Sequence, residues 1–185
     1  MRAEDLDRHR GGRVDDLIAS PTRLLFVGIN PGLWSAAVNA HFARPGNRFW
    51  PALVAAGIVD RVIDASTGLA YSDRQLLLTR GIGITNIVDV ATARADELTQ
   101  LELTAGGASL EARVKSLQPN VVAILGVTAY RAAFSERKAT LGQQPRMLGD
   151  RPTWVLPNPS GLNAHETVAS LGKKFREVAQ AAGVI

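Results

Sequence analysis

Two asparagines stand where apolar runs give way to turns, and they are the residues of this chain best placed to do chemistry. Asn30 lies in the segment 28–32 (Gly-Ile-Asn-Pro-Gly), and Asn158 begins the segment 158–162 (Asn-Pro-Ser-Gly-Leu). Glycine lets a backbone approach a ligand closely, and proline fixes the turn so that the asparagine keeps one direction. An amide carries one acceptor oxygen and two donor hydrogens, enough to hold a water or to read another amide edge. Taken singly, each segment is as typical of an ordinary turn.

Aromatic and basic residues gather soon after the first of these turns. The segment 41–50 reads His-Phe-Ala-Arg-Pro-Gly-Asn-Arg-Phe-Trp. A ring at the mouth of a pocket can stack on a nucleic-acid base, which contributes about 1–3 kcal/mol per base. We expect Phe49 and Trp50 to belong to the core, because they fall at helical spacing. Phe42 precedes that helix and is therefore the ring predicted to face a ligand.

The composition excludes several other kinds of site. The chain has no cysteine, so disulfides, thiolate nucleophiles and cysteine-ligated zinc are excluded. Its three histidines include no pair at the i, i+4 spacing, and we expect neither a metal site nor a cofactor. It also lacks the Gly-x-x-x-x-Gly-Lys-Ser/Thr phosphate loop and the Gly-x-Ser-x-Gly turn of serine hydrolases.

The charge distribution allows two interpretations. Residues 1–130 carry 13 basic and 13 acidic side chains, whereas residues 131–185 carry 8 against 4. This excess suits a basic face that binds phosphates. Charge alone favours the other interpretation, which is arginines spread over a solvated surface. The chain shows no apolar run long enough to span a bilayer and no secretion signal, so we expect a cytoplasmic protein.

Four short apolar runs predict the β-strands that would position these residues: 23–29, 83–88, 121–125 and 153–156. Helical spacing and helix-end signals predict helices over 47–57, 72–81, 109–119, 128–134 and 166–181, the second of them with a capping box between Ser72 and Gln75.

Strands that alternate with helices predict an α/β fold. We expect a single-domain, doubly wound and mostly parallel sheet of four to five strands flanked by helices over residues 21–185. Residues 1–20 would precede it as a short helix or a mobile arm. Ligands bind such sheets beyond the carboxyl ends of the strands, where Asn30, Asn86 and Asn158 all fall.

Four motifs in this order resemble the mismatch-specific uracil/thymine-DNA glycosylase family. They are Gly-Ile-Asn-Pro-Gly-Leu (28–33), Phe-Ala-Arg-Pro-Gly-Asn-Arg-Phe-Trp (42–50), Gly-Ile-Thr-Asn-Ile-Val (83–88) and Leu-Pro-Asn-Pro-Ser-Gly-Leu (156–162). The likeness covers about residues 23–180. It implies the fold of uracil-DNA glycosylases and an enzyme that flips a pyrimidine mispaired with guanine out of duplex DNA. Such an enzyme hydrolyses the N-glycosidic bond without a metal or a cofactor and leaves an abasic site.

The resemblance also implies roles for single residues. Asn30 would position the hydrolytic water, and Asn158 occupies the place where other uracil glycosylases carry a catalytic histidine. Phe42 would stack on the flipped base. The other substrate-binding residues would be Gly28, Ile29, Ser35 and Asn86. The wedge that enters the vacated base step would consist of Ser160, Gly161, Leu162 and Asn163.

An asparagine in place of a carboxylate base forfeits general-base assistance, which typically contributes about 10²–10⁴-fold. We therefore expect a slow glycosylase, and a monofunctional one because no lysine matches a Schiff-base position. Asp89 could supply a carboxylate, although a salt bridge or a turn is its more ordinary role. Its partner would be double-stranded DNA with a G·U or G·T mismatch, bound by a monomer associated with a bacterial nucleoid.

Two other functions stay open from the sequence. One is a catalytically weak or inert binder of mismatched or abasic DNA, and the other is a protein that binds small nucleotides. The segment 163–165 (Asn-Ala-His) departs from the serine and arginine that often follow the wedge leucine in the family, which puts a contact to the complementary strand in question.

Overall fold

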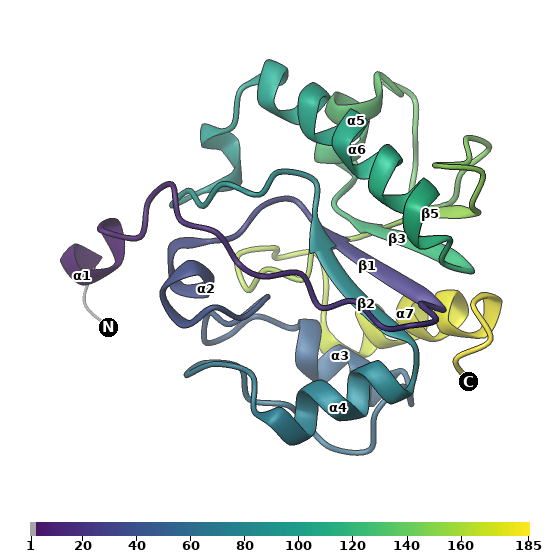
Figure 1. Ribbon diagram of the computed structural model, residues 1–185, viewed down its shortest axis with the longest axis horizontal. Coiled ribbons are helices and arrows are strands. Elements are labelled where there is room, and N and C mark those ends of the chain that lie inside the picture. The colour runs from purple at the N-terminus through teal and green to yellow at the C-terminus, as the bar shows by residue number, and fades with distance from the viewer. Residues whose placement is uncertain (1–2) are drawn as a thin grey trace.

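One five-stranded sheet organises the molecule (Figure 1). Its strand order is β2-β1-β3-β5-β4, and the four longer strands run parallel: β1 (Leu24–Gly28), β2 (Ile82–Asn86), β3 (Val121–Leu125) and β5 (Thr153–Leu156). The short strand β4 (Gly142–Gln143) pairs antiparallel with β5 at the edge. All residues of β1, β2 and β3 are buried, which accounts for their continuous apolar runs. The predicted fold class is confirmed.

Helices cover both faces of the sheet, and the computed structural model describes them over residues 3–185. The helices α5 (Gln100–Leu117) and α6 (Val127–Phe134) lie on one face, and α3 (Phe49–Ala55), α4 (Tyr71–Thr79) and α7 (Val168–Ala181) on the other (Figure 1). Shorter helical turns are α1 (Ala3–Asp7), α2 (Leu33–Val38) and the 3₁₀ turn η1 (Ala95–Glu97). No helix among the described residues is long and apolar enough to cross a membrane.

The side chains of alternate residues of β1 belong to two separate hydrophobic cores. Leu24 and Phe26 point into the core shared with α3 and α7, where Phe26 lies 5.2 Å from the ring of Phe49. Leu25 and Val27 point into the core shared with α5 and α6. This alternation follows from the pleat of a strand, whose successive side chains leave opposite faces. The expected core positions of Phe49 and Trp50 are confirmed, since they are 0% and 4% exposed.

The structure corrects three of the predictions for helix starts, and α3 also begins two residues later than expected, at Phe49. The helix α5 begins at Gln100 and not near Ser109, because Thr99 and Glu102 form a reciprocal capping box. In α4 the cap is Ala70, without a side-chain bond, so the predicted capping box of Ser72 is absent. The helix α7 begins at Val168, two residues later than expected, where Thr167 caps it.

The segment between α1 and β1 runs along the sheet and joins it. Leu17 exchanges two backbone hydrogen bonds with Ile84 of β2, at 2.9 and 2.7 Å, and its side chain is 1% exposed. Gly11 donates to Ala91 O at 2.9 Å, and Ala91 N donates to Gly12 O at 2.8 Å. Residues expected to precede the domain therefore contribute to its core and hold the segment that follows β2.

Candidate active site

A cavity of about 650 Å³ opens at the carboxyl ends of the parallel strands. Its walls are the turn after β1, the loop before α3, the segment 92–96 after β2 and the loop after β5. Every residue expected at the site borders it except Gly161: these are Gly28, Ile29, Asn30, Ser35, Phe42, Asn86, Asn158, Ser160, Leu162 and Asn163. The carboxyl ends of parallel strands lie at the same edge of the sheet, so the loops that follow these strands meet there.

The amide of Asn30 is held in one orientation by the segment after β2. Its Nδ2 donates to Val90 O at 2.9 Å and to Thr92 Oγ1 at 2.8 Å. The Thr92 hydroxyl gives its own hydrogen to Arg94 O at 2.7 Å, so toward Asn30 it accepts. Both amide hydrogens are thereby used. The oxygen Oδ1, on the other side of the amide, is left as an acceptor at the cavity.

Gly28 lets two pocket side chains approach the end of β1. A Cβ at this position would lie 2.4 Å from Asn86 Oδ1 and 3.3 Å from a ring carbon of Phe42. Any other residue here would have to displace the amide of Asn86 and press on the ring of Phe42. The requirement for glycine in the first motif is therefore a packing requirement of the pocket wall.

The ring of Phe42 is stacked on the buried ring of Phe49, with centroids 4.1 Å apart and planes inclined by 24°. Phe42 also borders the cavity. Its backbone φ is +53°, a conformation that costs a bulky residue on the order of 1–3 kcal/mol and persists where the surroundings impose it. The core thus fixes a flat apolar surface at the wall of the pocket.

His41 and Asn86 form a buried polar pair behind that ring. Burial lowers the pKa of His41 to about 4, so its imidazole is neutral near pH 7. Its Nε2 lies 3.2 Å from Asp15 O, a carbonyl that can only accept, which places the ring hydrogen on Nε2. Its Nδ1 then accepts from Asn86 Nδ2 at 3.4 Å. Asn86 consequently keeps Oδ1 as its acceptor toward the side of Gly28.

The loop after β5 is shaped by its own asparagines. Asn158 Oδ1 accepts from Ser160 N at 3.0 Å, and Asn163 Nδ2 donates to Asn158 O at 3.0 Å. Because the oxygen of Asn158 is used in this turn, its Nδ2 donor is what it can offer a ligand. At the rim, the side chain of Leu162 is 79% exposed.

Two further predicted residues act on the walls of the cavity through backbone contacts. The hydroxyl of buried Ser35 accepts from Ala43 N at 3.2 Å and so fixes the chain around Phe42. Gly161 packs against the loop before α3, where a Cβ would lie 2.7 Å from Gly46 O. Gly161 therefore supports the rim and does not line the cavity.

The charges at the cavity differ from those expected. Its cations are Arg44 and Arg94, and none of the basic residues of 131–185 borders it. In that last third of the chain, Arg146 pairs with Glu111 at 3.1 Å and Lys174 with Glu166 at 2.6 Å. The basic excess is therefore not a phosphate-binding wall of this site.

The carboxylates of the region are engaged with arginines. Asp89 lies 3.5 Å from Arg113 and does not line the cavity, so the salt-bridge interpretation holds. Within the described chain, Asp96 is the one carboxylate of the lining, and it is exposed and paired with Arg94. Among residues 3–185, no three histidine, aspartate or glutamate side chains gather closely enough to hold a metal ion.

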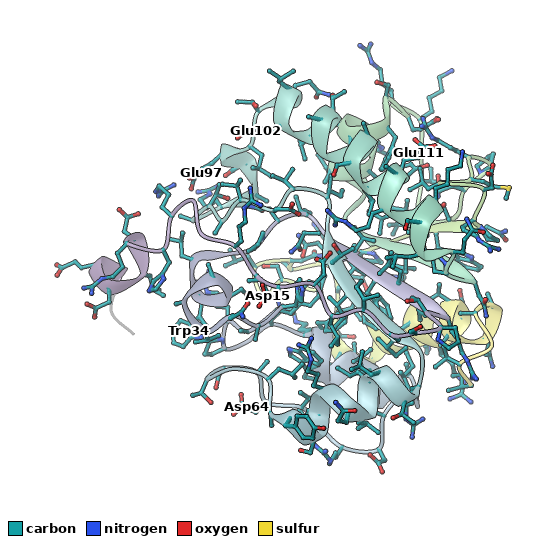
Figure 2. All side chains as sticks on the ribbon, viewed as in Figure 1. Asp15, Trp34, Asp64, Glu97, Glu102 and Glu111 are labelled. Atoms are coloured by element: carbon teal, nitrogen blue, oxygen red, sulfur yellow. The ribbon has the colours of Figure 1, made fainter. Side chains whose placement is uncertain are left out.

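Sequence reasoning missed Thr92 and His41, which orient the two asparagine amides, and also Arg44 and Arg94 at the mouth. Asp15, whose carbonyl oxygen binds His41, lies near the middle of the view in Figure 2, and Glu97 lies on the side of the molecule where α1 is. Neither His41 nor Thr92 belongs to a motif of its own. Their one sequence signal was proximity, since His41 precedes Phe42 and Thr92 follows the second strand closely.

The site is concave, lies at the carboxyl edge of a parallel sheet, and combines a fixed ring with two oriented amides and few charges, a combination that suits a flat polar ring. Residues 16–182 match the model of the uracil DNA glycosylase superfamily, which is most of the sequence. The chain therefore belongs to that superfamily. This membership supports a uracil-glycosylase role, which is that of a hydrolase acting on DNA.

A solved structure shows a similar fold. It is the solution NMR structure of a Methanosarcina acetivorans protein that is provisionally named a uracil DNA glycosylase. The two chains share 17% sequence identity with a TM-score of 0.59, over 91% of this chain and 98% of the other.

Proposed function

We propose that the protein removes uracil from DNA and prefers uracil that is mispaired with guanine. It would hydrolyse the N-glycosidic bond and leave an abasic site without cutting the strand. The observation that carries this proposal is the common cavity of Asn30 and Leu162, which come from the first and last loops of the sheet. At about 650 Å³ the cavity falls in the size range of small-molecule sites.

The pocket offers complementary groups to an extrahelical uracil. The free face of the Phe42 ring would stack on the base, since its other face is covered by Phe49. The acceptor Oδ1 of Asn86 suits the N3–H of uracil or thymine, whereas N3 of cytosine has no hydrogen to donate. The His41 contact keeps the amide in this orientation. Uracil and thymine are therefore favoured over cytosine.

Asn30 and Asn158 divide the chemistry between water and leaving group. Asn30 Oδ1 would accept a hydrogen from the attacking water, whose oxygen bonds to C1′ of the sugar. The electron pair of the C1′–N1 bond leaves with the base, and the proton lost by the water ends on it. Asn158 Nδ2 would stabilise the negative charge on the departing base by donation.

Selection of the mismatch would come from the cost of flipping. Extrusion of a base costs a few kcal/mol and is easiest for a weak pair such as G·U. The exposed Leu162 at the rim would fill the step that the base leaves. Thymine and modified pyrimidines opposite guanine would be secondary substrates.

One observation favours a second candidate, a catalytically weak binder of mismatched or abasic DNA. Asp89 is paired with Arg113, and Asp96 is exposed and paired with Arg94. Within the described lining, a water held by Asn30 therefore has no unpaired carboxylate to act as its base. Loss of such assistance costs about 10²–10⁴-fold in rate, so we propose slow turnover.

Release of free uracil decides between the two candidates. Single-turnover assays would use one oligonucleotide sequence with uracil opposite guanine, opposite adenine and in a single strand, then thymine, ethenocytosine, hypoxanthine and xanthine opposite guanine. We expect the fastest release from G·U, and the Asn30→Ala variant to be slower by about 10²-fold. Tight binding of an abasic duplex without any uracil release by the folded wild-type protein would replace the proposal with the binder. Normal release by Asn30→Ala would remove that residue from the chemistry.

A further inference from the structure

Arg48 lies beneath the wedge loop, which we define as residues 158–163, and gathers its backbone carbonyls. Its Nη1 donates to Asn163 O at 2.7 Å and to Ser160 O at 3.3 Å, and its Nη2 donates to Gly161 O at 3.3 Å. The backbone N of Arg48 adds a bond to Pro159 O at 2.9 Å. One residue of a different loop therefore binds four carbonyl oxygens of the wedge loop.

The support under Arg48 is rigid. It is the N-cap residue of α3, whose next two residues, Phe49 and Trp50, are buried in the core. Beside it, the backbone of Gly161 packs so closely on Gly46 that a Cβ would lie 2.7 Å from Gly46 O. The wedge loop thus rests on the amino-terminal end of a core helix.

The chain that follows the wedge loop is anchored separately, at the start of α7. Thr167 and Ser170 form the capping box of α7. Glu166 pairs with Lys174 at 2.6 Å. Between these two anchors the side chain of Leu162 is 79% exposed and forms no part of either core. Arg48 is consequently a side chain from outside the loop that binds its middle, in addition to the loop's own bonds made by Asn158, Ser160 and Asn163.

We propose that Arg48 is a positioning residue for the wedge, which keeps Leu162 projecting from the surface before DNA is bound. This inference rests on the proposed function. A loop that must be ordered during binding pays the entropy of that ordering, about 1–2 kcal/mol per residue for the backbone. The planar guanidinium reaches separate acceptors from two nitrogens at once, which the single ammonium of lysine does not reproduce.

This role predicts different effects on uracil release from duplex DNA and from single-stranded DNA. A wedge is needed where a base must leave a stacked duplex, and it is not needed for a base in a single strand. Loss of Arg48 would therefore slow uracil release from a duplex and leave release from a single strand nearly unchanged. A residue that only stabilised the fold would slow both equally.

The test compares Arg48→Met, Arg48→Lys, Leu162→Ala and the double variant Arg48→Met/Leu162→Ala in single-turnover release from a G·U duplex and from the matching single strand. We expect Arg48→Met to release uracil from the duplex at least about tenfold more slowly, which is the size of effect expected when one contact to a base step is lost. Release from the single strand should slow by less than about twofold. Arg48→Lys should lie between it and wild type. The double variant should release uracil from the duplex at the same rate as Leu162→Ala, because both changes remove the same function, that of the wedge.

The Arg44→Met variant is the comparison for charge alone, since Arg44 is exposed at the same cavity and makes no hydrogen bond to residues 158–163 in the described part of the chain. A duplex-specific loss of equal size in Arg44→Met and Arg48→Met, removed by higher salt, would attribute the effect to charge and overturn the inference. Full additivity of Arg48→Met with Leu162→Ala would also overturn it, as would equal losses on both substrates.

A measurement without substrate keeps this inference distinct from the proposed function. Backbone NMR order parameters of residues 160–163 should fall in Arg48→Met while those of α3 stay unchanged. Unchanged order in the wedge loop would refute the role of Arg48 even if the wild-type protein releases no uracil. Absence of release by a folded wild type with an ordered loop would refute the proposed function alone.

Discussion

At the scale of single residues, the site depends on which atom each amide presents. Asn30 and Asn86 could be placed from the sequence, because each stands at the end of a buried strand. The orientation of their amides could not be predicted from the sequence. Thr92 orients Asn30 and His41 orients Asn86, and in each pair the two residues lie far apart along the chain. The local sequence pattern therefore predicts where each asparagine lies, whereas the direction of its hydrogen bonds is known only from the folded structure.

The orientation of Asn30 leads to a prediction for Asn30→Asp. An oxygen in place of Nδ2 would lie 2.9 Å from Val90 O, where two acceptors face each other. We expect a loss of about 1–3 kcal/mol in unfolding free energy at pH 7. The loss should shrink in acid, where the protonated carboxyl can donate. Urea unfolding at two pH values measures this, and a variant as stable as wild type but 10²-fold faster would contradict the assigned orientation.

The neutral state of His41 predicts a pH dependence of stability. Its pKa is about 4 in the fold and near 6.5 in the unfolded chain, so between these values the unfolded state binds more protons. The stabilisation is complete above about pH 6.5 and is lost as the pH falls toward 4. Between pH 7 and pH 5 the loss amounts to about 2 kcal/mol.

The variant His41→Gln isolates this contribution, since glutamine can donate to Asp15 O but does not titrate. Urea unfolding of both proteins should show a stability difference that narrows as the pH falls from 7 to 5. A difference that stays constant with pH would mean that His41 is not buried in its neutral form.

At the scale of elements, strands were more readable than helix ends. The runs 121–125 and 153–156 coincide with β3 and β5, because strands buried on both faces have to be apolar throughout. The start of α5 was missed because Gly106 and Gly107 weaken the helical pattern within it. Those glycines serve packing: a Cβ would lie 2.4 Å from Ile87 O at the first and 2.7 Å from Ala133 O at the second.

This packing predicts that Gly106→Ala destabilises the protein although alanine is the better helix former by about 1 kcal/mol. The new methyl group would clash with the backbone at Ile87, for an expected net loss of about 1–3 kcal/mol. Ala108→Gly, at an exposed position of the same helix, measures propensity alone. Urea unfolding compares the two, and a stabilised Gly106→Ala would show that α5 can move away from the sheet.

At the scale of the whole molecule, the segment before β1 reaches the site through other residues. Gly11 and Gly12 bond to Ala91, next to the Thr92 that holds Asn30, and Arg10 pairs with Glu97 at 2.5 Å. The match to the family model begins at residue 16, so these contacts lie before it. The division of the chain at residue 20 followed from the first predicted strand at residue 23, and a local pattern carries no information about such long-range pairing.

Removal of residues 1–12 should therefore loosen the segment 91–97. Two backbone hydrogen bonds are lost at about 1 kcal/mol each, and hydrogen exchange in that segment should quicken. The rate of uracil release should fall more than the affinity for a G·U duplex, because Thr92, which holds the amide of Asn30, would no longer be fixed. Removal of residues 1–7 alone serves as the control and should have little effect on either. Equal release rates in both truncated proteins would show that the segment is not coupled to the site.

The walls of the cavity are loops that follow parallel strands, while the two helical layers pack elsewhere on the same sheet. Most residues of the two cores therefore lie outside the cavity wall, whereas Asn30, His41 and Phe42 contribute both to the wall and to stability. Under the proposed function, an engineer could vary the exposed loop around Leu162 to change substrate preference while the two helical layers stay as they are. Natural substitutions at exposed rim positions such as Leu162 would likewise change the proposed substrate preference with little effect on folding.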